Sequence, residues 1–535
     1  MSGCPAAVSY DRTPCPMTPH ELGLPESVTA WRPVQEDMFE YCLTSEKRFT
    51  ALGAPPGCGK SAFAYGLARL LGGRTVILTA NLGLQNIYRN SFGSVGLASV
   101  WGRSNYSCWE GGTCEDGARM GCKDRLGCPY LGDLRVWQEA PQAVTNYAYW
   151  LAANQYGTGL TQPDTLICDE AVLASEWLSR SLDFHITERE CAEARLRWST
   201  PPGEDVAEWA ALAPKVQAAA QFAYDYAKAR MPSATPVNRE RLAHQLKHAE
   251  GFLDRTARLS QLDDNWVVSR EDGSDRGRLW RFECIWPGRY RERLFRHIPR
   301  VILMSATLRR KTLGLLGIPQ QDVDFREWPR QFPAANGPVI WLPTAKVGRN
   351  MTAEEEQAWL GRNSDILRWG NDRNGIIHTV SYARAKQISE HCAGLARLYV
   401  NGAADPDSTS ARDKYEEFLH APVGSALVSP SFSTGWDFPY KTAEWQTISK
   451  IAFPDTRSKI MQVRTSLDKH YGNYLAAQDV AQGSGRIVRD YDDCGTTLLI
   501  DDNWRWFRHA ASDHFPAWFK VRTEHSLPRP LPKLQ

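Results

Sequence analysis

The residues best suited to chemistry form a short glycine-rich segment, Ala54-Pro55-Pro56-Gly57-Cys58-Gly59-Lys60-Ser61. Apart from alanine in place of the first glycine, the segment fits the P-loop pattern G-x-x-x-x-G-K-[ST]. Gly57 and Gly59 let backbone N–H groups curl around a phosphate. Lys60 supplies a positive charge, and the hydroxyl of Ser61 can bind Mg²⁺. The segment therefore predicts a nucleoside triphosphate site, and a chance match on a glycine-rich turn is the alternative.

Two acidic residues that follow an apolar run, Asp169 and Glu170, are the expected partners of this site. A P-loop needs a carboxylate at the end of a neighbouring strand, and Asp169 would hold Mg²⁺ there, directly or through water. Glu170 would polarise the attacking water, the step that turns nucleotide binding into hydrolysis. Two acids after a strand are often only its solvated end, but their pairing with a P-loop favours the catalytic interpretation.

A further candidate catalytic segment lies near the end of the chain, Gln482-Gly483-Ser484-Gly485-Arg486-Ile487-Val488-Arg489. Two arginines three positions apart share one face of a helix. In an ATPase with two lobes, Arg486 and Arg489 could reach across the cleft and neutralise charge on the transferred phosphoryl group. A surface helix with solvated arginines is the alternative.

Alternating strand and helix patterns must position these residues. Apolar runs predict strands at 48–52, 74–79, 164–168, 300–304, 338–342, 374–378, 425–429 and 497–501. Such alternation predicts an α/β fold whose parallel sheets are covered by helices. The uneven spacing indicates two insertions, and the second, 175–295, has the composition of several amphipathic helices. Prolines and an Ala-Asn-Gly turn place the main domain junction within 322–337.

The composition is that of an ordinary globular protein, with 535 residues, 42% hydrophobic residues and a net charge of +2. It excludes disordered, collagen-like and coiled-coil chains, and it requires any nucleic-acid surface to be local. No apolar run has the length of a membrane span, and the N-terminus does not read as a signal peptide. We therefore expect a cytoplasmic protein without a disulfide framework.

Four cysteines lie close together in the first insertion: Cys108, Cys114, Cys122 and Cys128. The surrounding glycine-rich segment cannot build a core of its own, so a bound metal or cluster would organise it. Structural zinc sites usually contain close C-x₂₋₄-C pairs, which are absent here, and the ferredoxin spacings are absent too. The spacing alone leaves open an iron–sulfur cluster, a zinc ion and unligated cysteines.

A segment rich in arginine and aromatic residues, 276–300, is the candidate nucleic-acid surface. Guanidinium groups bind phosphates and aromatic rings stack on bases, which suits a single strand held without sequence preference. The alternative is a helix with solvated arginines and core aromatics. The candidate contact residues are Arg281, Trp286, Arg289, Tyr290 and Arg293.

In their order along the chain, these motifs resemble those of superfamily 2 helicases, specifically the XPD and DinG group of iron–sulfur DNA helicases. Arg32-Pro33-Val34-Gln35 is similar to the adenine-side motif of the group, and Thr79-Ala80-Asn81-Leu82 with Gln85 is similar to motif Ia. The P-loop corresponds to motif I, Asp169 to Val172 to a DEAH-like motif II, and Ser305-Ala306-Thr307 to motif III. Ser433 to Phe438 is similar to motif V, and Gln482 to Arg489 to motif VI.

The resemblance implies an α/β protein with two RecA-like parallel-sheet domains, the first interrupted by an iron–sulfur insertion and a helical arch insertion. The first RecA-like domain would comprise 1–100, 141–174 and 297–328, the iron–sulfur domain 101–140, the arch 175–296 and the second RecA-like domain 329–535. The group has Asn-Tyr-x-Cys before its first cluster cysteine and Cys-Pro-Tyr at its last, as this chain does, which implies a 4Fe-4S cluster on the four cysteines.

The resemblance also implies an activity, an ATP-dependent DNA helicase that moves 5′ to 3′ on single-stranded DNA and acts on tailed or forked duplexes, as a monomer. ATP would be bound with Mg²⁺, Gln482 would sense the γ-phosphate, and further nucleotide contacts are expected from Arg32, Gln35, Gly435 and Asp437.

Two departures from the group's pattern bear on coupling between the ATP cleft and the nucleic acid. Val172 replaces the family histidine of motif II, and Thr434 stands in place of the usual glutamate of motif V. Two other function classes therefore stay open. One is a nucleic-acid-stimulated ATPase that translocates without unwinding, and the other is a metal-organised nucleic-acid-binding module with a vestigial nucleotide site.

Overall fold

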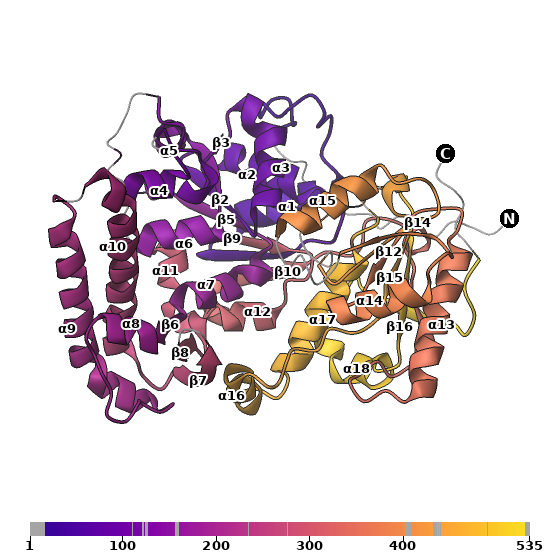
Figure 1. The fold of residues 1–535 in the computed structure, drawn as a ribbon. Helices are drawn as coiled ribbons and strands as arrows, with labels where there is room; N and C mark the ends of the chain where they lie inside the picture. The colour runs from indigo at the N-terminus through magenta and orange to yellow at the C-terminus, as the bar shows by residue number, and fades with distance from the viewer. Residues whose placement is uncertain are drawn as a thin grey trace.

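The computed structural model shows a molecule of two lobes with an additional helical region beside the first lobe (Figure 1). It describes residues 17–109, 111–119, 122, 127–155, 160–233, 235–274, 277–401, 408–431, 436, 438, 440–488 and 490–529. Within these residues, no helix combines the length and the apolar sequence needed to cross a membrane.

The first lobe is built on a seven-stranded, all-parallel sheet with the strand order β10-β1-β9-β5-β2-β4-β3. The strands are β1 (Phe49–Gly53), β2 (Thr75–Thr79), β3 (Ala98–Ser99), β4 (Gln142–Asn146), β5 (Thr165–Asp169), β9 (Arg300–Ser305) and β10 (Val323–Glu327). Every residue of β1, β2, β4 and β5 is buried. Such strands need helices on both faces, which explains their short, largely apolar sequences.

Helices cover both faces of this sheet. On one face, α1 (Pro33–Thr44), α2 (Lys60–Leu71) and α3 (Leu82–Phe92) pack on side chains such as Ile77 and Ile302. On the other, α5 (Pro129–Glu139), α6 (Tyr147–Gln155) and α7 (Ala174–Leu182) pack on side chains such as Val76 and Leu303. The carboxyl ends of the parallel strands therefore share one edge, where β1 and β5 deliver the P-loop and Asp169.

The second lobe repeats this architecture with the strand order β13-β14-β12-β15-β16-β11-β17, again all parallel. The strands are β11 (Val339–Ala345), β12 (Gly375–His378), β13 (Arg397–Val400), β14 (Ser425–Ser429), β15 (Trp445–Ile448), β16 (Thr496–Asp501) and β17 (Val521–Thr523). The covering helices are α13 (Ala353–Trp369) and α14 (Tyr382–His391) on one face and α15 (Ser408–Leu419), α17 (Tyr471–Ser484) and α18 (Trp504–Ala510) on the other. Between the two sheets, the chain runs from the end of β10 at Glu327 to the start of β11 at Val339, so β10 occupies the first part of the segment 322–337.

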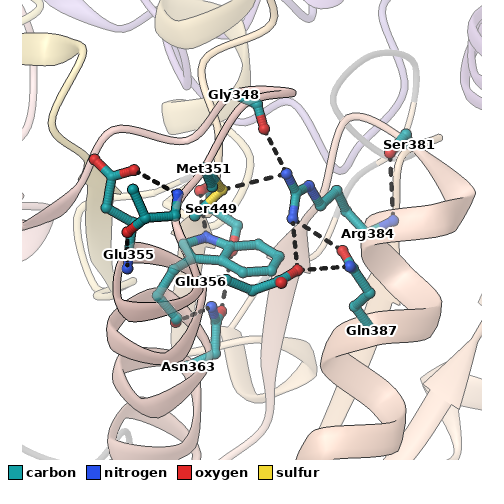
Figure 2. Close-up of polar contacts among 11 residues, drawn as sticks. Gly348, Met351, Glu355, Glu356, Asn363, Ser381, Arg384, Gln387 and Ser449 are labelled. Atoms are coloured by element: carbon teal, nitrogen blue, oxygen red, sulfur yellow. Dashed lines mark hydrogen bonds and ion pairs between the residues drawn. The ribbon is translucent and has the colours of Figure 1, made fainter.

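A polar network centred on Arg384 fastens the outer helices of the second lobe (Figure 2). The guanidinium donates to the Gly348 carbonyl at 2.6 Å and pairs with the Glu356 carboxylate at 3.4 Å. It also lies 5.0 Å from the ring centre of Trp359. Because these partners come from the loop after β11, from α13 and from α14 itself, one cation fixes three segments of the lobe.

The chain between β5 and β9 leaves the first sheet and forms the second insertion. Its long helices α9 (Val206–Arg230) and α10 (Pro236–Ala257) run side by side (Figure 1). The helices expected here are present, but a three-stranded antiparallel sheet, β6-β8-β7, was not predicted. It consists of β6 (Phe184–Thr187), β7 (Trp266–Ser274) and β8 (Gly277–Cys284).

The small sheet corrects the interpretation of the arginine-rich segment as one helix. In β8 the side chains of Trp280, Phe282 and Cys284 are buried and alternate with more exposed Arg281 and Glu283, the period of a strand with one face on a core. The sheet also contacts the second lobe, since Arg464 of α16 (Lys459–Leu467) donates to the carbonyl of Cys284 at 2.7 Å.

Candidate active site

The phosphate-binding loop joins β1 to α2, and Lys60 is the first residue of the helix. Gly57 and Gly59 have φ angles of 73° and 80°, in the left-handed region that glycine enters without steric cost. A Cβ at Gly59 would lie 2.6 Å from Nε2 of Gln35. Both glycines are therefore required by the geometry, and the loop presents a helix N-terminus, the ordinary site for a phosphate.

Arg32 and Gln35, expected near the nucleotide, lie directly against this loop. Nε2 of Gln35 donates to the Gly59 carbonyl at 2.9 Å, and its Oε1 accepts the backbone N–H of Arg32 at 2.8 Å. The Arg32 guanidinium donates to the Gly57 carbonyl and pairs with Asp490 of the second lobe at 3.0 Å. The ion pair across the lobes was not predicted, because no local pattern connects residues so far apart along the chain.

Asp169 ends β5 as expected and is almost fully buried, with 2% of its surface exposed. Tyr88 donates to its carboxylate at 2.8 Å, and Tyr147 donates to its backbone carbonyl at 3.0 Å. The pKa of Asp169 is raised to about 6, mainly by burial and also by the neighbouring Glu170 carboxylate, while the positive charge of Lys60 opposes both. A buried carboxylate of this kind gains from a cation beside it, which fits a metal-holding role. The two tyrosines had no signal in the sequence.

Glu170 adopts an unusual backbone conformation, with φ at 49° in a residue that is not glycine. Strained positions of this kind cluster at active sites. Its Oε2 accepts a hydrogen bond from Oγ of Ser305 at 2.7 Å, and Ser305 ends β9, the strand beside β5. Motif III was recognised in the sequence, but this contact was not. It fixes the glutamate in one orientation at the edge where the P-loop lies.

The second lobe meets this edge through the end of α17. Nε2 of Gln482 donates to Oγ1 of Thr307 in motif III at 3.2 Å. A Cβ at Gly485 would lie 2.9 Å from Cγ of Pro56 in the P-loop. The structure therefore brings motif VI of one lobe against motifs I and III of the other, as expected for a site shared between two lobes.

Other predicted residues are placed differently or lie outside the described residues. The Arg486 guanidinium donates to the backbone carbonyl of Trp436 at 3.3 Å, which ties it to the segment expected to form motif V. Gly435, Asp437 and Arg489, together with Ser433 and Thr434, lie outside the described residues.

One departure from the family pattern, Val172, and one motif of the first lobe have structural explanations. Val172 is 8% exposed in a short helical turn after Glu170, so an apolar side chain fills the place of the family histidine. Asn81 of motif Ia caps α3 by accepting the N–H of Leu84 at 2.9 Å. Gln85 is buried and accepts a hydrogen bond from Asn146 at 2.8 Å, which ties α3 to β4.

All four cysteines of the first insertion are half-buried, and none forms a disulfide bond. Cys114 opens α4 (Cys114–Arg119), and Cys128 immediately precedes α5. Burial raises the pKa of the Cys114 thiol, and the nearby thiols of Cys128, Cys108 and Cys122 raise it too. The other three cysteines are therefore close enough to Cys114 to interact with it electrostatically. A Cβ at Gly117 would lie only 2.0 Å from Sγ of Cys108.

The donor set, four thiols, fits an iron–sulfur cluster in kind and number. As they are arranged among the described residues, however, no three or more Cys, His, Asp or Glu side chains form a group that could hold a metal ion.

The expected nucleic-acid residues of 276–300 are largely engaged within the protein. Arg281 pairs with Glu271 and Arg289 with Asp264, each at 2.8 Å. The remaining three make close contacts too: Arg293 lies 5.7 Å from the ring centre of Tyr290, Tyr290 accepts from Trp266 at 3.1 Å, and Trp286 packs on Tyr471 at 5.5 Å. Arg281 and Arg289 are thus neutralised by acidic partners, and Arg293 is packed on an aromatic ring.

Comparison with known proteins assigns the C-terminal domain to a family and shows which solved structures share the fold of the chain. Residues 371–522 match the helicase C-terminal domain family. An XPD helicase structure is similar over 93% of this chain and 100% of its own, with a TM-score of 0.63 and 14% identity. An apo XPD structure (TM-score 0.58) and Xpd4 of S. tokodaii (0.57) are each 12% identical and cover 92% of this chain and 100% of their own. No curated protein sequence matches the chain.

At these identities the structural likeness is one of fold. The predicted XPD-like arrangement of two RecA-like parallel-sheet lobes is therefore confirmed, and the second lobe carries a helicase C-terminal domain.

Proposed function

We propose that the protein is an ATP- and Mg²⁺-dependent DNA helicase that moves 5′ to 3′ along single-stranded DNA. The observation that carries this proposal is the approach of motif VI to the phosphate loop and motif III across the two lobes. A nucleotide bound there would touch both lobes, so its hydrolysis would change how the lobes are held together. DNA, the polarity of movement and strand separation are carried over from the likeness to XPD.

The first lobe would supply the chemistry. Lys60 and the loop N–H groups bind the phosphates, and Ser61 and Asp169 hold Mg²⁺, which supplies positive charge to the phosphate oxygens. Glu170 accepts a proton from the attacking water, and Ser305 keeps its carboxylate in place through the 2.7 Å hydrogen bond.

The second lobe would sense the nucleotide. Gln482 already contacts Thr307 in motif III, so a γ-phosphate beside it would be coupled to a residue of the first lobe. Arg486 and Arg489 would contribute positive charge from the opposite side of the cleft. When the γ-phosphate leaves, these contacts weaken and the lobes can shift relative to each other on the bound strand.

The four gathered cysteines would hold a 4Fe-4S cluster, which would give the first insertion the internal support that its glycine-rich sequence lacks. The insertion is joined to the first lobe through aromatic side chains: Tyr106 packs on Tyr130 at 5.5 Å, and Tyr130 shares a hydrogen bond with Tyr149 of α6 at 2.9 Å. A rigid insertion fastened in this way is suited to separating strands at the edge of the lobe.

Steady-state ATP turnover tests the proposed activity, measured without nucleic acid, with single-stranded DNA and with single-stranded RNA. We expect turnover that is stimulated more by DNA than by RNA. Lys60→Ala should abolish turnover while single-strand binding persists, and Lys60→Arg serves as a control that keeps the charge. Absence of turnover under all conditions would contradict the proposal and favour a metal-organised binding module.

A second candidate function is an ATPase that translocates on nucleic acid without unwinding a duplex. The observation in its favour is Val172, whose buried apolar side chain cannot relay a hydrogen bond from the hydrolytic site. Strong strand-stimulated turnover without separation of any duplex would select this function. A monomeric state and a cytoplasmic location, both expected from the sequence, stay predictions.

A further inference from the structure

The helix hairpin of the second insertion carries a row of cations and aromatic rings along α9. Phe222 and Tyr226 are one helical turn apart and 47% and 51% exposed, with ring planes within 16° of parallel. The Arg195 guanidinium lies 5.1 Å from the ring centre of Phe222 and 5.9 Å from that of Tyr226. The Arg230 guanidinium lies 5.3 Å from the ring centre of Tyr226.

The row continues toward the start of the helix, where Nζ of Lys215 lies 5.6 Å from the ring centre of Trp198. We call this set the α9 row; its members are Lys215, Trp198, Arg195, Phe222, Tyr226 and Arg230. All three cations are exposed. The nearest acid along the helix, Asp225, accepts a hydrogen bond from Gln221 at 3.0 Å.

The cations of the α9 row differ in their pairing from three arginines described above, Arg281, Arg289 and Arg384. Among the ion pairs between described residues, none includes Arg195, Lys215 or Arg230. Arg281 and Arg289, by contrast, each pair with an acid, and Arg384 pairs with Glu356. The α9 row thus combines two half-exposed aromatic rings with positive charge that no carboxylate neutralises in the described part of the chain.

Arg195 occupies a left-handed backbone position that usually holds glycine. It follows α8 (Glu188–Glu193), its φ is 60°, and its N–H donates to the Ala192 carbonyl at 3.0 Å. Glycine is the usual residue in the left-handed position after a helix, because any side chain there is strained. An arginine at a strained position of this kind suggests a role for its side chain.

We infer that the α9 row binds a single strand of nucleic acid, as a contact site separate from the nucleotide cleft. Aromatic faces stack on bases and the cations between them meet phosphates, without sequence preference. From Lys215 to Arg230 the helix extends for about 22 Å at 1.5 Å per residue. At about 3.4 Å per nucleotide, this length matches roughly six nucleotides. The inference rests on the proposed function, since it adds a site for the same strand.

The placement of α9 decides what the row can affect. The helix lies at the end of the molecule away from the second lobe (Figure 1). The row therefore contributes to strand affinity and leaves the hydrolytic step alone. At saturating DNA, variants of the row should keep the wild-type rate of ATP turnover, while the DNA concentration for half-maximal stimulation rises.

Fluorescence anisotropy with a labelled oligothymidylate longer than the row tests the inference on the full chain. For Arg195→Gln with Arg230→Gln, we expect a Kd at least about fivefold higher and a salt slope smaller by about 1.4, which is two single-strand phosphate contacts at 0.7 each. For Phe222→Leu with Tyr226→Leu, we expect about tenfold weaker binding with an unchanged salt slope, because stacking is lost and charge is kept.

The matched control removes the same charge elsewhere. Arg180 and Arg412 are exposed, and each pairs with a glutamate one turn away on its helix. Arg180→Gln with Arg412→Gln should leave the Kd within about twofold of the wild type.

Arg195→Gly separates binding from folding. Glycine suits the left-handed position, so this variant should melt at the wild-type temperature or higher while its Kd rises. The inference would be overturned if the row variants bound the oligonucleotide as tightly as the control variant does. Row variants that lose affinity for a protein partner but keep their affinity for the oligonucleotide would overturn it in the same way. A wild-type protein that binds the strand through the row but shows no strand-stimulated turnover would refute the proposed function alone.

Discussion

At the scale of single residues, the candidate site depends on contacts that hold its two acids. Asp169 is surrounded by Tyr88 and Tyr147, and Glu170 is held by Ser305. The acids themselves were predictable because they follow an apolar strand in a chain with a P-loop. Their partners come from other strands and helices, and a tyrosine in a helix carries no local sign that it will face a carboxylate.

Ser305→Ala tests the assigned role of Glu170. A hydrogen bond to a charged group contributes about 1.5–3 kcal/mol, so its loss should lower the kcat of ATP hydrolysis by about tenfold or more while KM for ATP changes little. Ser305→Thr keeps a hydroxyl and should recover a large part of the activity. An alanine variant with wild-type kcat would show that Glu170 is positioned by other groups or does not act in the reaction.

The buried His378 predicts an acid-dependent loss of stability in the second lobe. Its ring shares a hydrogen bond with Gln446 at 3.1 Å, and burial lowers its pKa to about 4. The folded lobe therefore holds the ring neutral, whereas the unfolded chain takes up a proton below about pH 6.5. As the pH falls from about 6.5 to about 4, this one group should destabilise the fold by up to about 3 kcal/mol.

Thermal unfolding of His378→Gln and wild type at about pH 7.5 and about pH 5 measures this contribution. The glutamine variant should lose less of its melting temperature on acidification than the wild type does. Equal losses in the two proteins would show that His378 is protonated in the folded state or that other groups dominate.

At the scale of elements, the end of α17 is the contact that converts two separate lobes into one site. Gly485 approaches Pro56 so closely that a single added carbon would force one of the two residues to move. The glycine was visible in motif VI, but its partner in the P-loop could not be read from the sequence, since the two residues belong to different domains.

Substitution at Gly485 should therefore impair turnover in proportion to side-chain size. Overpacking costs about 1–3 kcal/mol, so Gly485→Val should lower kcat/KM for ATP about fivefold or more, and Gly485→Ala less. Gly472, at the start of the same helix, has its nearest contact at an ordinary 3.6 Å, and Gly472→Ala is the control. Wild-type turnover by Gly485→Val would contradict the closed arrangement of the two lobes as the hydrolytic state.

The first insertion gives a prediction about its cysteines. If the four thiols hold an iron–sulfur cluster, Cys108→Ser should remove the visible absorbance and the iron of anaerobically purified protein. It should impair strand separation more than ATP hydrolysis, because the cluster supports an insertion away from the P-loop. Cys494→Ser, in the second lobe, should retain both iron and activity. A wild-type protein that contains zinc and no iron would contradict the cluster.

At the scale of the whole molecule, the sequence predicted the central strands of both sheets and the order of the motifs. The eight predicted strands correspond to β1, β2, β5, β9, β11, β12, β14 and β16, and β11 extends beyond its predicted end at 342 to Ala345. Buried parallel strands leave a continuous apolar run, which is a strong local signal. Short strands of mixed composition, such as β13 (Arg397–Val400) and β15 (Trp445–Ile448), gave no such run and form through pairing with neighbours.

The candidate nucleic-acid surface shows the limit of composition as a guide. The segment 276–300 has the right residue types, but its strand periodicity buries Trp280 and Phe282 and pairs Arg281 with an acid. The α9 row has fewer arginines and no dense cluster in the sequence. It was found only because the fold places Arg195 over two rings of another helix.

The most direct test of the proposed helicase is ATP-driven strand separation by anaerobically purified protein. The substrates are two matched duplexes that differ only in whether a 5′ or a 3′ single-stranded tail is present. We expect unwinding of the 5′-tailed duplex alone, dependent on ATP and lost in Lys60→Ala. Failure to separate either duplex, with strand-stimulated ATP turnover intact, would contradict the helicase and make Val172 and Thr434 the first positions to change.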